Sequence, residues 1–104
     1  MATELKKNEP KRSSYVPVGR VVLRQIGDDQ LLVPVSGGAA EGHSIFPLNA
    51  TGAFIWERLA RREPLETVAH ALSREFDVTV ERANVDCREF VETLVKQGLL
   101  EKAR

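Results

Sequence analysis

Length, composition and charge set the first limits on this protein. The chain has 104 residues, 42% of them hydrophobic, which suffices for one small domain with one core and not for two. Its 15 basic and 15 acidic residues cancel, so it lacks the positive field that draws proteins to nucleic acid or anionic membranes. We therefore expect neither as a partner. The single cysteine, Cys87, cannot form an internal disulfide, and no apolar signal segment opens the chain, so we expect a soluble cytoplasmic protein.

Residues 1–14 are polar, contain Pro10 and show no periodic apolar pattern. Such a segment cannot bury enough surface to offset the entropy lost on ordering. We predict a disordered tail over 1–14 and a single domain over 15–104. The tail is mildly basic, which leaves an anion-binding arm as the alternative.

Three strands are predicted in the first half of the chain. The segment "GRVVLRQI" (19–26), a turn at 27–29 and "QLLVPV" (30–35) together predict a hairpin. Pro34 cannot donate a hydrogen bond, so we expect the second strand to stop or bulge there. A third strand, 43–46, follows a glycine-rich connection, and we expect Pro47 to end it.

The second half has helical periodicity. Asn49 is a good N-cap for a helix that carries Ile55, Trp56 and Leu59 on one side. A second helix is predicted from an apolar stripe over 65–76, with Pro64 in its first turn.

A third, longer helix is predicted to begin after Thr79 and to end at Gly98. Leu99 and Leu100 are then expected to fold back onto the core. The predicted order is β-β-β-α-α-α, an α+β fold like a winged helix-turn-helix, with a three-stranded antiparallel sheet followed by three helices.

The sequence offers no catalytic constellation and no metal site. Cys87 lies in the apolar arc of the third predicted helix, so we expect it to be a core residue. A nucleophilic thiol would need a base within hydrogen-bonding reach. His43 and His70 have no partner at the spacing that helical metal sites use, and we expect His70 to be solvated. The loop "SGGAAEG" lacks the lysine and hydroxyl residue of a phosphate-binding loop. We predict no enzymatic activity, no cofactor and no metal.

A winged-helix regulator that binds DNA or another protein is the alternative function. Three helices beside a few strands fit that architecture, and the third helix would then lie in the major groove. That helix carries more acidic than basic residues, which removes the phosphate contacts that supply most non-specific affinity. The protein-binding form of this alternative stays open.

The third predicted strand suggests a different function. "HSIF" (43–46) carries no lysine or glutamate to block an exposed sheet edge, so another extended chain can pair with it. The third helix can wall such a site with Val85 and Val95, which lie outside its apolar arc, and with Asn84 and Arg88 at the border. Alternatively, these valines cover the sheet or are exposed. The same edge can also pair with a second copy of the chain and form a homodimer.

Three segments then resemble a known family. "LNATGAFIWERL" (48–59), "PLETVAHALSREFDV" (64–78) and "FVETLVKQGLL" (90–100) are similar to the PqqD-like family, the RiPP recognition elements. Its members typically show Leu-Asn-x-Thr-Gly-x-x-Ile-Trp, a Val/Ile-Ala-x-x-Leu helix and a closing Gly-Leu-Leu/Ile. The resemblance runs over about 21–101. Members dedicated to pyrroloquinoline quinone synthesis have a different junction, so the broader family fits better.

The resemblance implies a three-stranded sheet packed on three helices and a non-enzymatic peptide chaperone. Such a chaperone takes up the leader of a ribosomally synthesised precursor peptide in a groove between the third strand and the third helix. It presents the peptide to a modifying enzyme, often a radical S-adenosylmethionine (radical SAM) protein with a SPASM extension, whose iron–sulfur clusters this chain cannot ligate. By position, the implied peptide-binding residues are Ser44, Ile45, Phe46, Asn84, Arg88, Val91 and Val95.

The junction between strand and helix has a structural interpretation. We expect Leu48 and Trp56 to clamp the third strand to the first helix and Asn49 to cap that helix. Gly52 allows close backbone approach in the first turn. These four residues are predicted to hold the strand edge without touching the peptide.

Overall fold

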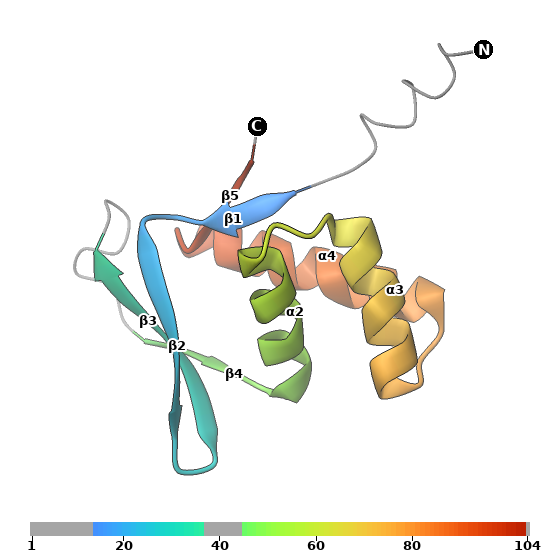
Figure 1. Cartoon of the computed structure of the whole chain (residues 1–104), viewed down its shortest axis with the longest axis horizontal. Helices are drawn as coiled ribbons and strands as arrows, with labels where there is room; N and C mark the ends of the chain where they lie inside the picture. Colours follow the sequence, from blue (N-terminus) through green and yellow to red (C-terminus); the bar gives the residue numbers. More distant parts are fainter. Residues whose placement is uncertain (1–13, 37–44, 104) are drawn as a thin grey trace.

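The computed structural model describes residues 14–36 and 45–103. The described part of the chain is an α+β fold in which antiparallel strands are followed by three helices, as the sequence predicts (Figure 1). The strands are β1 (Tyr15–Pro17), β2 (Arg20–Ile26), β3 (Asp29–Ser36), β4 (Phe46–Leu48) and β5 (Leu100–Lys102). The helices are α2 (Ala50–Ala60), α3 (Leu65–Phe76) and α4 (Val80–Lys96).

Strands β2 and β3 form the predicted hairpin. The turn contains Gly27, whose φ of 63° is a conformation that glycine adopts without strain. Arg20 pairs with Ser36 and Val21 pairs with Pro34, so Val35 is an extra residue in the ladder. Of the two outcomes expected at Pro34, a stop or a bulge, the structure shows the bulge, and β3 continues to Ser36.

The prediction for the third strand is wrong in its boundaries. The structure places β4 at Phe46–Leu48, in register with Gln30–Leu32 of β3, and the strand passes through Pro47 instead of ending there. Pro47 is tolerated because β4 lies at the edge of the β2-β3-β4 sheet, where a missing N–H costs little. The other predicted strand residues, 43 and 44, lie outside the described residues, and Ile45 precedes the strand.

Each helix begins where its cap predicts, or within one residue of it. The N–H of Gly52 donates to Asn49 Oδ1 at 2.7 Å, and that of Arg82 donates to Thr79 Oγ1 at 3.0 Å. Pro64 is the N-cap of α3 and not a first-turn residue, because its ψ of 148° is extended. The predicted starts of α2 and α4 are confirmed.

The C-terminus folds back as predicted and then forms a strand that was not predicted. Gly98 ends α4 with a φ of 77°, and the N–H of Leu99 donates to the carbonyl of Leu94 at 2.9 Å. Leu99 and Leu100 are only 3% and 2% exposed. β5 then pairs antiparallel with β1, with Tyr15 opposite Lys102, in a separate two-stranded sheet.

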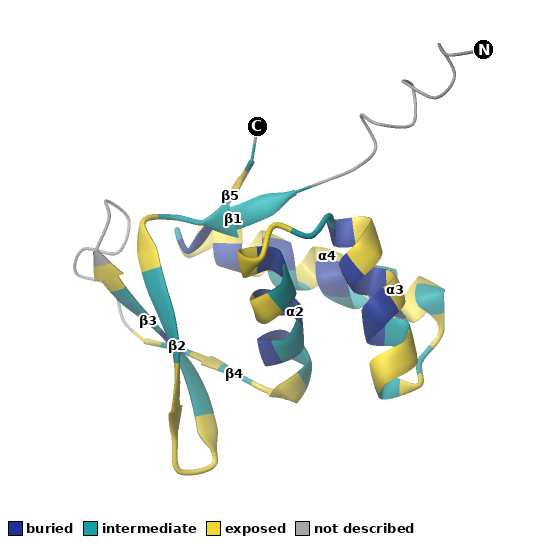
Figure 2. Ribbon diagram, viewed as in Figure 1, coloured by how far each residue is buried: buried dark blue, intermediate teal, exposed yellow. Residues whose placement is uncertain are grey.

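The core lies between the helices and the inner face of the larger sheet. All three helices lie to one side of β2, β3 and β4 (Figure 1), and their inward faces are buried (Figure 2). Cys87 is fully buried, which confirms its predicted place in the core. Trp56, at 3% exposed, packs in the same cluster as most of the other buried residues, among them Leu32, Ile55, Leu59, Val68, Leu72, Val91 and Leu94. No helix in the described ranges is long and apolar enough to cross a membrane.

Candidate functional site

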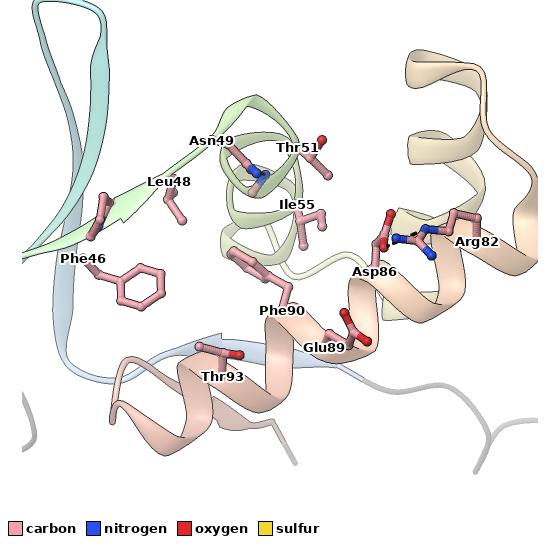
Figure 3. Close-up of a pocket in the computed structure, with 12 residues that line it drawn as sticks. Phe46, Leu48, Asn49, Thr51, Ile55, Arg82, Asp86, Glu89, Phe90 and Thr93 are labelled. Atoms are coloured by element: carbon pink, nitrogen blue, oxygen red, sulfur yellow. Dashed lines mark hydrogen bonds and ion pairs between the residues drawn. The ribbon is translucent and has the colours of Figure 1, made fainter.

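A hollow of about 460 Å³ lies between β4, the first turns of α2 and one flank of α4 (Figure 3). We call it the β4–α4 groove. Its lining residues are Phe46, Pro47, Leu48, Asn49, Thr51, Gly52, Ile55, Arg82, Asp86, Glu89, Phe90 and Thr93.

The inner side of the β4–α4 groove is apolar. Phe46 and Leu48 come from β4, Phe90 comes from α4, and all three are half-buried against the core. The side chains of Phe46 and Phe90 lie on either side of the space between strand and helix (Figure 3). An apolar side chain that entered between them would lose contact with water on several sides, and burial of that kind drives binding.

Gly52 sets how closely α2 can approach α4 at this groove. A β-carbon on Gly52 would lie 3.1 Å from Phe90 Cε1 and 3.2 Å from Leu48 Cδ2, closer than side chains normally pack. Side chains, and not another backbone segment, occupy the space beside Gly52, and a larger residue there would force them apart. The side chain that approaches it most closely is that of Phe90, from α4.

The outer side of the groove is polar and net acidic. Arg82 Nε lies 3.3 Å from Asp86 Oδ1, an ion pair one helical turn apart. Glu89 is exposed and forms no ion pair with any residue that the structure describes. Thr93, one turn further along α4, is also exposed. The lining thus has two carboxylates and one guanidinium.

The backbone of β4 borders the groove as a sheet edge. In the described residues β4 is paired on one side only, with β3. An edge strand presents N–H and C=O groups that another extended chain can pair with. Pro47 contributes no N–H, and β4 is three residues long, so any such pairing within β4 is short.

The structure separates the residues that the resemblance placed in the peptide site. Phe46 lines the β4–α4 groove, whereas Asn84 and Arg88 line another hollow of about 190 Å³ with Tyr15, Leu65 and Glu66. The two hollows lie on different flanks of α4.

The remaining residues of the predicted peptide site also lie away from the groove lining. Val91 is 4% exposed and belongs to the core, and Val95 is 42% exposed outside the lining. Ile45 is 50% exposed beside β4, and Ser44 lies outside the described residues.

Of the predicted junction residues, Trp56 is buried in the core, while Leu48, Asn49 and Gly52 also line the groove. Leu48, Asn49 and Gly52 thus form part of the hollow beside the strand edge, whereas the sequence predicts that they do not touch the peptide.

Sequence reasoning missed the flank of α4 that lines the groove. Arg82, Asp86, Glu89, Phe90 and Thr93 follow the spacing of one helical face. From the sequence, their charged members were counted only in the acidic excess that disfavours DNA binding. The missed signal was an aromatic residue at the border of the apolar arc, next to a polar face that no other predicted element covered.

Neither Cys87 nor His70 is among the residues that line the groove. Cys87 is buried behind the lining, and burial, followed by the neighbouring charge of Asp86, raises the pKa of its thiol from 9.0 to about 11, which disfavours the reactive thiolate. His70 is exposed on α3, as predicted. Within the described ranges no three His, Cys, Asp or Glu residues are grouped closely enough to hold a metal ion.

The fold and the groove define a class of protein: a small α+β domain whose sheet edge and last helix enclose an open groove. The family can now be stated. The family model for Coenzyme PQQ synthesis protein D (PqqD) matches residues 38–100, and the chain belongs to this family. A search of curated proteins found none that matches this chain.

A solved structure supports the same fold. The chain is similar to a protein in a structure entitled "Lasso peptide synthetase B1 complexed with the leader peptide", with a TM-score of 0.72 and 22% sequence identity. The similarity covers 85% of this chain and 98% of that one. At this level of identity the likeness establishes the fold.

Proposed function

We propose that this protein is a non-enzymatic peptide chaperone. It binds the leader of a ribosomally synthesised precursor peptide as an added strand on β4 and presents the peptide to a modifying enzyme. The observation that carries the proposal is the edge of β4 with which no described residue pairs, beside the β4–α4 groove. Strand addition takes affinity from backbone hydrogen bonds and specificity from side-chain pockets beside the edge.

Because the edge is short, backbone hydrogen bonds supply only part of the affinity and side-chain burial must supply the rest. Three residues, one of them a proline, form too few backbone hydrogen bonds to hold a peptide alone. The apolar space between Phe46 and Phe90 supplies the rest by burying a side chain of the guest. We therefore place the helix wall of the site on the Phe90 and Thr93 flank of α4, and not on the Asn84 and Arg88 flank.

Two comparisons support this function. The chain belongs to the PqqD family, and the structurally similar protein, by its title, is complexed with a leader peptide. The modifying enzyme that we propose as partner is a radical SAM protein with a SPASM extension. In this arrangement the partner provides the catalytic chemistry and its iron–sulfur clusters, and this chain provides peptide recognition.

The test is a substitution that places a bulky side chain in the groove and leaves the core residues unchanged. Thr93 is exposed and lines the groove, so Thr93→Trp introduces a large side chain into it. Thr67 is exposed on α3 outside the groove lining, and Thr67→Trp is the matched control. The probe is a peptide selected from a phage-displayed random library on the full chain, then synthesised with a fluorescent label. Binding is measured by anisotropy.

We expect Thr93→Trp to weaken binding about tenfold or more, because the indole would occupy space that the guest side chain needs. A tenfold loss corresponds to about 1.4 kcal/mol of binding free energy. Thr67→Trp should bind like the unmodified chain, and both variants should melt normally. A library that yields no binding peptide would contradict the proposal. So would equal affinity of the two variants for the selected peptide.

A further inference from the structure

We propose that the β4–α4 groove selects a peptide segment with a lysine or arginine, whose cationic side chain pairs with Glu89. This inference rests on the proposed function and adds the charge of the guest to it. The sequence alone pointed to the opposite sign, because it placed Arg88 beside the peptide.

The cation of the groove is already paired. Arg82 Nε lies 3.3 Å from Asp86 Oδ1, with side chains 66% and 27% exposed, so the charge of Asp86 is compensated within α4. Arg82 is also the only cationic residue among the described lining residues. An acidic guest side chain would therefore compete with Asp86 for its partner.

Glu89 is the groove carboxylate that remains available. It follows Asp86 by three residues, is exposed, and has no ion pair within the described part of the chain. A carboxylate that accepts charge-assisted hydrogen bonds from a guanidinium or ammonium group satisfies its charge without changing the helix. The guest supplies the missing cation.

The neighbouring side chains make this position selective. Glu89 directly precedes Phe90, so the free carboxylate borders the apolar space that is proposed to hold the guest's anchor residue. A docked peptide displaces water there, which lowers the local dielectric and strengthens an ion pair across the groove. Over its whole length α4 carries four carboxylates and three cations, so its own net charge is slightly negative.

The strand geometry gives the sequence pattern expected in the guest. In an added strand, residues on one face alternate, so the residues on either side of a given position point the same way. An apolar residue between Phe46 and Phe90 and a cation at Glu89 face the same groove. We expect the docked segment to contain an apolar residue and a lysine or arginine with one residue between them.

The experiment is a double-mutant cycle on a peptide selected as above. The peptide is compared with a copy in which its basic residue is replaced by glutamine. Both are titrated into the full chain, the Glu89→Gln variant and the control Glu92→Gln. Glu92 is exposed on α4 outside the lining, so the control removes the same charge from the same helix.

We expect the glutamine peptide to bind the unmodified chain about two- to fivefold more weakly, the range of a partly exposed ion pair. The Glu89→Gln variant should bind the basic peptide more weakly by the same factor, and it should bind the two peptides with equal affinity. The Glu92→Gln variant should still prefer the basic peptide. Selected peptides without an enriched basic position would overturn the inference, as would Glu89→Gln if it kept the full preference. Either result leaves peptide binding itself intact, while a failed selection overturns the proposed function.

Discussion

Among single residues, Trp56 is the one that connects the core to the candidate site. Its side chain is 3% exposed and packs in the main core cluster, next in sequence to Ile55, which lines the β4–α4 groove. Asn49 begins the same helix by accepting the N–H of Gly52. The rim of the groove is therefore carried by a helix that Asn49 caps and that Trp56 anchors in the core.

Replacing the indole measures this dependence. Trp56→Ala should lower the free energy of unfolding by about 3 kcal/mol or more, because the surrounding core cannot fill the cavity. Urea unfolding followed by circular dichroism measures the loss. Glu57→Ala, an exposed change on the same helix, should stay within about 0.5 kcal/mol of the unmodified chain. Equal losses in the two variants would show that Trp56 is not a core anchor.

At the level of elements, the helices could be predicted well and the strands only partly. Asn49 and Thr79 cap their helices through side chains that act within three residues, so local sequence suffices to place α2 and α4. β1 and β5 are three residues each and meet from opposite ends of the described chain. Neither strand has an alternating pattern long enough to predict it, because each is defined by its partner.

The C-terminal strand is expected to contribute strongly to stability. Leu100 is 2% exposed and opens β5 opposite Pro17 of β1. Leu100→Ala should cost about 2 to 5 kcal/mol through the lost side chain and the cavity that it leaves. Glu101→Ala, an exposed change in the same strand, is the control. Urea midpoints that coincide for the two variants would show that the β1–β5 sheet is dispensable.

The whole molecule is electrically balanced, with 15 basic and 15 acidic residues. Its α4 helix, which a DNA-binding reading would place in the major groove, carries Glu81, Asp86, Glu89 and Glu92 against three cations. Phosphate contacts supply most of the non-specific affinity for DNA, and this surface provides few of them. Balanced charge thus favours a partner that is held by shape and local charge.

A salt titration distinguishes these partners. We expect a fluorescent random-sequence DNA duplex to show no saturable binding to the chain at about 0.15 M ionic strength. The affinity of a selected peptide should fall only severalfold from low to high salt, because a single ion pair is involved. Saturable DNA binding that falls steeply with salt would support the winged-helix alternative instead.

The sequence by itself determined the class of fold, the starts of the three helices to within one residue, the hairpin with an interruption near Pro34 and the burial of Cys87. These features depend on capping groups, hydrophobic period and turn residues, all of which act over a few neighbouring positions. The Leu48-Asn49-x-Thr51-Gly52 junction also pointed to the family that the chain belongs to.

Only the tertiary structure decided which flank of α4 borders β4. The apolar arc of that helix is wide, and the sequence leaves its rotation open by about one residue, roughly 100°, which would exchange Arg88 for Glu89 at the groove. Packing of α4 against α2, α3 and β5 sets that rotation, with Phe90 seated against Gly52. Such contacts between distant segments have no local signal, and they determine the charge that a bound peptide would meet.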